Sequence, residues 1–190
     1  NEDILKMDKK IIIALSLLLM VFTYGCTGGT SHSQGIQGQV VAGNTGKVGI
    51  TLGNLAPDFT VNTIDGKTVS LSRLTSEKPT VLYFFATWCP NCAKDFATLK
   101  KVYPQYADKV NFLAVDMDLK ESEYQIAGYK QKLSIPGIEF AAGKKDILAD
   151  YNVIYTTTKY FVGKDGTILN KGVGGIDENP WHQVFQSMAQ

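Results

Sequence analysis

The sequence predicts an α/β fold in which a central mixed β-sheet is flanked by helices and preceded by an N-terminal β-hairpin. Three observations lead to this prediction. Residues 81–86 form a continuous apolar and aromatic run, which suits a strand that is buried on both faces. Residues 92–102 then carry apolar side chains at helical spacing. Near the C-terminus, the sequence GKDG separates two apolar runs and is typical of a hairpin turn.

The first half of the domain alternates strands and helices. Two short extended segments flank Asp65 and Gly66, a residue pair that favours a hairpin turn. After the strand 81–86 and the helix 92–102, Pro104 should end the helix because proline lacks the backbone donor that a helix requires. The pattern continues with a strand at 110–115, a helix through 126–133, a strand at 138–140 and a short helix that ends at 151.

The C-terminal part is predicted to be a hairpin followed by a helix. Segments 158–162 and 167–170 should add an antiparallel edge to the parallel strands. Asn179 and Pro180 are typical of a helix start, as N-cap and first-turn proline. Residues 181–188 supply the apolar face of this helix. The predicted sheet is therefore mixed, with helices on both sides.

Composition indicates one globular domain with an additional segment at one end. The chain has 190 residues, of which 44% are hydrophobic and 19% are charged. The formal net charge is +1, and there is no basic block or acidic tail. Electrostatics therefore do not indicate nucleic acid as a partner. A functional assignment has to come from side-chain chemistry.

Residues 1–25 are predicted to be a signal peptide. A charged stretch at 8–10 precedes the apolar run 11–22. This run is shorter than the roughly 20 residues that a membrane-spanning helix needs, although a permanent span is the alternative. Gly25 and Cys26 resemble the lipobox of bacterial lipoproteins, which implies an exported chain anchored to the membrane by lipid on Cys26. The alternative is that Cys26 is incidental.

The segment 27–52 is predicted to be a flexible tether. It is rich in glycine, carries Lys47 as its one charge, and has no helical or alternating apolar period. A glycine-rich chain of this length spans roughly 25–30 Å on average. Such a span would hold the following domain, residues 53–190, away from a membrane surface.

Cys89 and Cys92 are the candidate reactive residues. At the start of a helix, side chains three apart share a face and their Cα atoms lie about 5–6 Å apart, within disulfide range. Unpaired backbone N–H groups and the helix dipole favour the thiolate of Cys89, so its pKa should fall below about 8.5. We expect Cys89 to be accessible and Cys92 to lie deeper. Pro90 suits the first helical turn, and Trp88 should shield one side of the pair.

The same cysteines have two other interpretations. A disulfide that closes a four-residue loop removes little entropy from the unfolded chain, so a purely structural role is disfavoured. Zinc would need two further ligands, and the only imidazoles are those of His32 and His182. A redox couple, in which Cys89 attacks a disulfide and Cys92 resolves the product, fits the spacing better.

Two segments resemble a known family. Ala56-Pro57-Asp58-Phe59 and Trp88-Cys89-Pro90-Asn91-Cys92 are similar, in order and separation, to motifs of the TlpA-like and ResA-like branch of the thioredoxin superfamily. The resemblance covers roughly residues 53–190 and implies a thioredoxin fold. It implies an extracytoplasmic, membrane-tethered thiol:disulfide oxidoreductase without a bound cofactor, and it favours a reductant. The implied partners are protein thiols or disulfides and an upstream redox protein.

The resemblance also assigns roles to single residues. Cys89 matches the nucleophile and Cys92 the resolving thiol, while Pro90 and Asn91 between them tune the couple. Thr156 matches a residue whose backbone pairs with the substrate chain in relatives.

This chain departs from the family at two positions. Thr157 stands where relatives have a cis-proline, and a cis bond before a non-proline residue costs about 3–4 kcal/mol. We therefore expect a trans bond or a strained loop. Tyr83 stands where thioredoxin has a buried carboxylate, so this chain must do without that acid or use another one. Asp116 and Asp118 are candidates for the base, and the alternative is that they are solvated loop carboxylates.

Two other functions stay open at this stage. Peroxiredoxins share the APDF opening, although here Thr87 lies only two residues before Cys89 and Arg73 is the single arginine. Alternatively, the domain is a binding module with passive cysteines, an interpretation that the threonine at position 157 leaves open. Peroxide consumption would identify the first alternative, and an unshifted Cys89 thiol pKa would identify the second.

Overall fold

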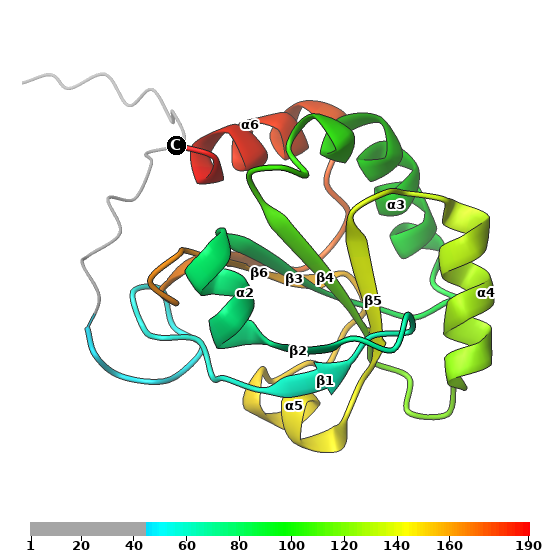
Figure 1. Ribbon diagram of the computed structural model, residues 1–190, viewed down its shortest axis with the longest axis horizontal. Helices are drawn as coiled ribbons and strands as arrows, with labels where there is room; N and C mark the ends of the chain where they lie inside the picture. The colour runs from blue at the N-terminus through cyan, green and yellow to red at the C-terminus, as the bar shows by residue number, and fades with distance from the viewer. Residues whose placement is uncertain (1–44) are drawn as a thin grey trace, which may run out of the picture. The chain divides into compact units, whose positions relative to one another are not determined.

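The computed structural model of the protein describes residues 45–190 (Figure 1). The predicted signal peptide, Cys26, His32 and most of the predicted tether 27–52 lie outside the described residues. Within residues 45–190, no helix combines the length and the apolar character that crossing a membrane requires.

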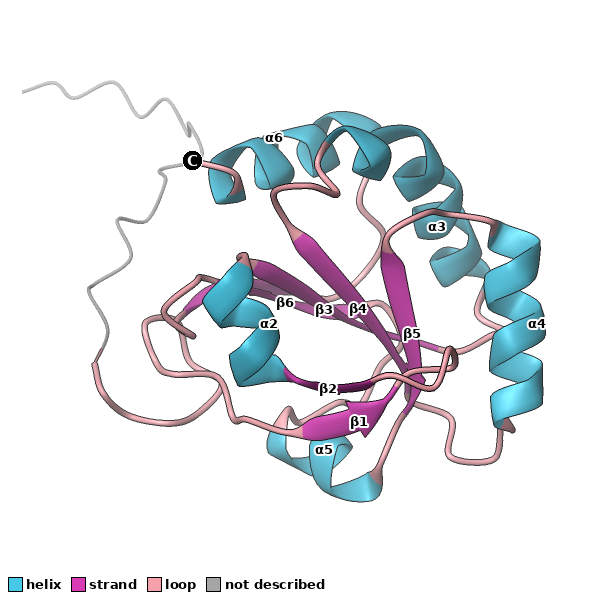
Figure 2. Ribbon diagram, in the orientation of Figure 1, coloured by secondary structure: helices cyan, strands magenta, loops and turns pink. Residues whose placement is uncertain are grey.

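A five-stranded mixed sheet forms the centre of the domain, with the strand order β5-β4-β3-β6-β7 (Figure 2). The strands are β3 (Thr80–Phe85), β4 (Asn111–Asp116), β5 (Ile138–Ala142), β6 (Thr158–Val162) and β7 (Ile168–Gly172). β3, β4 and β5 run parallel to one another, whereas β6 is antiparallel to β3 and β7 is antiparallel to β6. The predicted mixed sheet is confirmed, including its antiparallel edge.

The predicted N-terminal hairpin is also confirmed. β1 (Thr60–Asn62) pairs antiparallel with β2 (Thr68–Ser70). Gly66 in the connecting turn has a φ of +79°, a conformation that glycine adopts without strain. An isolated bridge between Thr63 and Ala141 attaches the hairpin to β5, the edge strand of the central sheet.

Helices cover both faces of the sheet (Figure 2). They are α2 (Leu71–Glu77), α3 (Pro90–Val102), α4 (Glu123–Leu133), α5 (Lys145–Asp150) and α6 (Glu178–Met188), with a 3-10 turn η1 (Tyr103–Gln105) after α3. Buried side chains of α3, α4 and α6 share one core, and those of α2 and α5 share the other. The end of α3 just before Pro104 agrees with the prediction, but the start of α6 does not. Its N-cap is Asp177, so the predicted N-cap, Asn179, lies inside the helix.

The strand β3 connects the two cores. Its side chains alternate between faces, so Val81, Tyr83 and Phe85 join the core under α3, while Leu82 and Phe84 join the other. The strand is buried throughout, as the apolar run predicted. This alternation places the hydroxyl-bearing Tyr83 on the same side of the sheet as α3, which matters for the cysteine pair.

Residues 45–52 contact the domain, although the sequence assigned them to the tether. Leu55 N–H donates to the carbonyl of Lys47 at 2.8 Å, and Gly49 N–H donates to the carbonyl of Leu55 at 2.9 Å. The side chain of Lys171 donates to the carbonyl of Ile50 at 2.9 Å. The described chain is therefore hydrogen-bonded to the domain before residue 53.

Candidate active site

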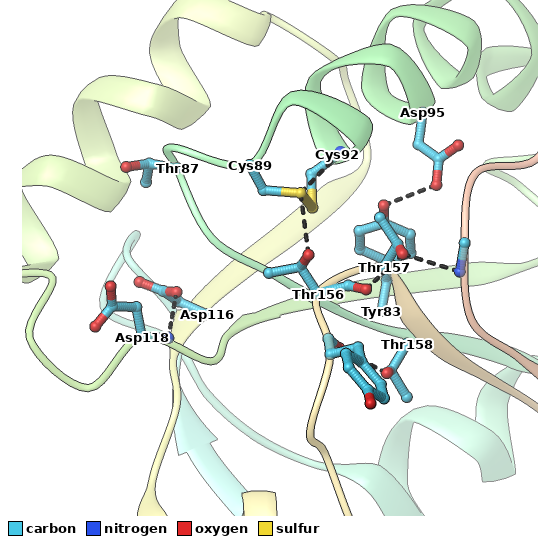
Figure 3. The surroundings of a disulfide bond; sticks show 12 residues. Tyr83, Thr87, Cys89, Cys92, Asp95, Asp116, Asp118, Thr156, Thr157 and Thr158 are labelled. Atoms are coloured by element: carbon cyan, nitrogen blue, oxygen red, sulfur yellow. Dashed lines mark hydrogen bonds between the residues drawn. A yellow bond between two sulfur atoms is a disulfide. The ribbon is translucent and has the colours of Figure 1, made fainter.

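Cys89 and Cys92 form a disulfide at the start of α3 (Figure 3). Cys89 is the N-cap of the helix, and Pro90 occupies the first turn. Cys92 lies three residues after Cys89. The Cα atoms are 5.2 Å apart, which agrees with the separation expected from the spacing. Closing or opening this bond therefore requires little movement of the backbone.

The sulfur of Cys89 takes the place of a capping oxygen. The backbone N–H of Cys92 donates to Cys89 Sγ at 3.1 Å, so one of the unpaired donors of the first turn points at this sulfur. In the reduced protein the same donor and the positive end of the helix dipole would stabilise a thiolate on Cys89. The geometry thus supports the assignment of Cys89 as the nucleophile.

The structure corrects the expectation that Cys89 is openly accessible. Its exposed fraction is only 3%, against 0% for Cys92. The order of burial is as predicted, but both sulfurs lie beneath their neighbours. Thr156 contributes to this cover, because its Oγ1 lies 3.2 Å from Cys89 Sγ (Figure 3). Thr156 therefore lies directly beside the sulfur that a substrate would have to reach.

Trp88 points to solvent beside the pair. Its side chain is 63% exposed, and its indole N–H donates to Asp118 Oδ2 at 2.8 Å. A side chain that is this exposed shields the disulfide only in part. Pro90 and Asn91, the two residues between the cysteines, are exposed as well.

The loop that relatives end with a cis-proline is built differently in this chain. All peptide bonds among the described residues are trans, and Thr157 has a φ of +63°. This region is unfavourable for a β-branched residue, so its contacts must hold it. Thr157 N–H donates to the carbonyl of Phe84 at 2.8 Å, and its hydroxyl accepts from Gly174 N–H at 2.9 Å. Of the two expectations, a trans bond or a strained loop, the trans bond is present, and this loop places Thr156 against Cys89.

A buried carboxylate that the sequence did not predict lies on the same helix as Cys92. Asp95 follows Cys92 by three residues on α3 and is 2% exposed. Its Oδ2 accepts a hydrogen bond from the Tyr83 hydroxyl at 2.8 Å, and its Oδ1 accepts from Ile176 N–H at 2.8 Å. Lys159 Nζ lies 3.5 Å from Oδ2. Tyr83 thus does not replace the buried acid of thioredoxin; it positions one that comes from the helix.

Burial shifts the pKa values of both partners of Asp95. Burial, and secondarily the negative charge of Asp95, hold the pKa of Tyr83 far above its usual range, so the phenol stays a neutral donor. Lys159 is 1% exposed, and burial lowers its pKa while Asp95 opposes this shift. Lys159 Nζ also donates to the carbonyl of Gly174 and lies 5.3 Å from the centre of the Tyr83 ring.

The two acids proposed from the sequence differ in their environments. Asp118 is half-buried in the loop after β4, and the hydrogen bond from Trp88 lowers the pKa of its carboxyl. Asp116 is 1% exposed at the end of β4, where burial raises its pKa to about 8. In Figure 3 both lie on the side of the disulfide where Thr87 is found, whereas Asp95 lies near Cys92 and Tyr83.

The residues considered for other chemistries lie elsewhere. Arg73, which a peroxidase would need beside the cysteine, forms an exposed ion pair with Glu77 within α2. The ring of His182 on α6 lies 3.2 Å from the hydroxyl of Tyr106. Among residues 45–190, no three His, Cys, Asp or Glu side chains are grouped in a way that could hold a metal.

Similar proteins are known for most of this domain. Residues 52–171 match the model of the AhpC/TSA family. Thioredoxin-like protein YneN of Bacillus subtilis is 33% identical over 138 residues, 72% of this chain and 80% of that protein. Thiol-disulfide oxidoreductase ResA of Bacillus cereus is 32% identical over 126 residues, 65% of this chain and 70% of that protein.

Solved structures agree on the fold. A putative thiol:disulfide interchange protein DsbE from Chlorobium tepidum superposes with a TM-score of 0.65 at 22% identity, covering 74% of this chain and 99% of that one. StoA from Bacillus subtilis superposes with a TM-score of 0.57 at 20% identity, covering 67% and 96%. The match to the family model leads to one assignment: the chain belongs to the AhpC/TSA family of thioredoxin-like proteins.

Proposed function

We propose that the protein is a thiol:disulfide oxidoreductase that reduces protein disulfides at the outer face of the cell membrane. The observation that carries this proposal is the Cys89–Cys92 disulfide at the N-terminus of α3, in a chain similar to proteins named thiol-disulfide oxidoreductases. Cys89 is the nucleophile and Cys92 the resolving thiol. No cofactor is needed, because the two sulfurs carry both electrons.

The reaction takes place in two exchange steps. The Cys89 thiolate attacks one sulfur of the substrate disulfide, a new S–S bond forms, and the other substrate sulfur leaves as a thiolate. Cys92 then loses its proton and attacks Cys89 Sγ, which breaks the mixed disulfide and releases the second substrate thiolate. The substrate gains two electrons and, on protonation, two thiols, while the enzyme is left with its own disulfide. An upstream redox partner must then reduce this disulfide.

Asp95 is the proposed acceptor for the Cys92 proton. It is buried, and it lies on the same face of α3 as Cys92, three residues further along. The Tyr83 hydroxyl and Lys159 hold its carboxylate in one orientation. Asp95 is therefore the buried carboxylate on the Cys92 face of α3 that we assign this role.

The location rests on the N-terminal sequence. The signal-like segment 1–25, the possible lipidation of Cys26 and the glycine-rich chain after it are consistent with an exported domain held at a membrane. Protein disulfides persist outside the reducing cytosol, so substrates for a reductant are available there.

The test compares disulfide reduction with peroxide reduction by the reduced full chain. We expect release of substrate thiols from insulin and from hydroxyethyl disulfide, with one Cys89–Cys92 disulfide formed per substrate disulfide. Hydrogen peroxide should react no faster than it does with an ordinary free thiol, because Arg73 is paired with Glu77 on α2. Rapid peroxide consumption with slow insulin reduction would instead favour the peroxidase alternative that the APDF opening leaves open.

A further inference from the structure

Thr87, two residues before Cys89, is held by a single side chain from another segment. Its backbone N–H donates to Glu121 Oε2 at 2.9 Å, and its hydroxyl donates to Glu121 Oε1. The two oxygens of the Glu121 carboxylate therefore fix both the backbone and the side chain of Thr87, which lies two residues before the nucleophile Cys89. This Glu121–Thr87 contact has no part in the exchange steps described above.

Asp116, the last residue of β4, is buried and has an incomplete set of hydrogen bonds. Its Oδ1 accepts from Asp118 N–H at 2.9 Å, but no donor among the described residues reaches Oδ2. A buried carboxylate oxygen without a donor is costly. The partner that faces Asp116 is the Glu121 side chain, and two carboxyl groups can share a hydrogen bond only when one of them carries a proton.

We propose that Asp116 and Glu121 share one proton and act as a positioning pair for Cys89, with Glu121 holding Thr87 only while Asp116 is protonated. The proposal rests on the proposed function, since it concerns how that function's nucleophile is placed. Asp116 donates its proton to Glu121, and the ionised Glu121 accepts both donors of Thr87. Each oxygen of the pair is then satisfied.

The surroundings of Asp116 favour its protonated form. Facing groups on the adjacent strands are apolar, because Asp116 is paired with Phe85 of β3 and Ala142 of β5. Asp118 adds a second negative charge, while the positive charge of Lys120 acts on Asp118. From α4, the phenol of Tyr129 faces Glu121, and burial raises the Tyr129 pKa to about 12, so it stays neutral.

The proton should leave in a narrow and accessible pH range. Burial, with Glu121 and Asp118, raises the pKa of Asp116 to about 8. Asp116 is therefore fully protonated well below pH 8, and it loses its proton as the pH rises through about 8. Two adjacent carboxylates then repel each other, and Glu121 can lower its energy by turning to water and releasing Thr87. The release should reach Trp88, the next residue, and then Cys89.

Trp88 provides the readout. The chain has two tryptophans, Trp88 at 63% exposure and Trp181 at 0%, so iodide quenches mainly Trp88. In the oxidised full chain Cys89 and Cys92 do not titrate. We expect the iodide-quenched emission to change with a midpoint near pH 8. In Asp116→Asn the amide donates to Glu121 at every pH, so this transition should disappear, whereas the matched control Asp150→Asn should keep it.

A second variant tests the pair from its other side. Glu121→Gln removes the charge that ionised Asp116 would repel, so the transition near pH 8 should disappear in this variant as well. In the reduced protein, the alkylation rate of Cys89 should show an additional step near pH 8 that Asp116→Asn lacks. The proposal is overturned if the unaltered protein shows no transition between about pH 6.5 and 9.5, or if Asp116→Asn leaves the transition in place. If either outcome is found and the protein still reduces insulin at neutral pH, the proposed role of the Asp116–Glu121 pair is wrong but the proposed function stands.

Discussion

Replacing Cys92 with serine is expected to convert the protein into a trap that accumulates a mixed disulfide between Cys89 and its substrate. The first exchange step needs only the Cys89 thiolate, whereas release needs a second sulfur at position 92. With insulin as substrate, a covalent adduct sensitive to reductant should form, and mass spectrometry should place it on Cys89. Turnover should fall to the uncatalysed rate of exchange.

The matched variants make this result specific. Cys89→Ser should give neither adduct nor turnover, because Cys92 is 0% exposed and lies behind the first sulfur. Cys26→Ser should behave like the unaltered protein, which excludes the third cysteine as the source of an adduct. Turnover by Cys92→Ser, or an adduct on Cys92 in Cys89→Ser, would contradict the assigned roles.

Replacing Lys159 with methionine should lower the free energy of unfolding by about 3–5 kcal/mol. The substitution keeps the length of the side chain but removes the cation 3.5 Å from Asp95, a carboxylate that is 2% exposed. An uncompensated buried charge accounts for the loss. Urea denaturation of the oxidised protein, followed by far-ultraviolet circular dichroism, measures it.

Two further variants separate the charge from the packing. Tyr83→Phe removes one hydrogen bond to Asp95 and leaves Lys159 in place, so we expect a smaller loss of about 1–3 kcal/mol. Combining Lys159→Met with Asp95→Leu removes both charges and should recover most of the stability, because an apolar pair of similar volume can replace a buried ion pair. If Lys159→Met costs no more than Tyr83→Phe, the buried ion pair does not have the role assigned to it.

Features encoded in short stretches of the chain could be predicted. The apolar run 81–86 gave a buried strand, and the spacing of Cys89 and Cys92 gave a disulfide at the start of a helix. The residue pair Asp65-Gly66 gave a hairpin turn. Each of these depends on neighbours within a few positions. The short helix α2 (Leu71–Glu77) was missed, because seven residues show too little periodicity.

Features that join distant segments could not be predicted. Asp95 and Lys159 come from α3 and β6, and nothing in either segment indicates the other. One local signal for Asp95 existed, namely a carboxylate on the apolar face that contains Cys92 and Phe96. The contact of Glu121 with Thr87 likewise joins the loop before α4 to the end of β3. The burial of Cys89 depends on Thr156, 67 positions away, so the sequence suggested a sulfur more accessible than it is.

The most direct test of a working redox couple is the reduction potential of Cys89–Cys92, measured on the full chain by equilibration with glutathione or dithiothreitol buffers. A couple that exchanges electrons with protein disulfides should lie between about −270 and −120 mV, and a reductant should lie near the lower end. A potential below about −300 mV, typical of structural disulfides in secreted proteins, would contradict the account.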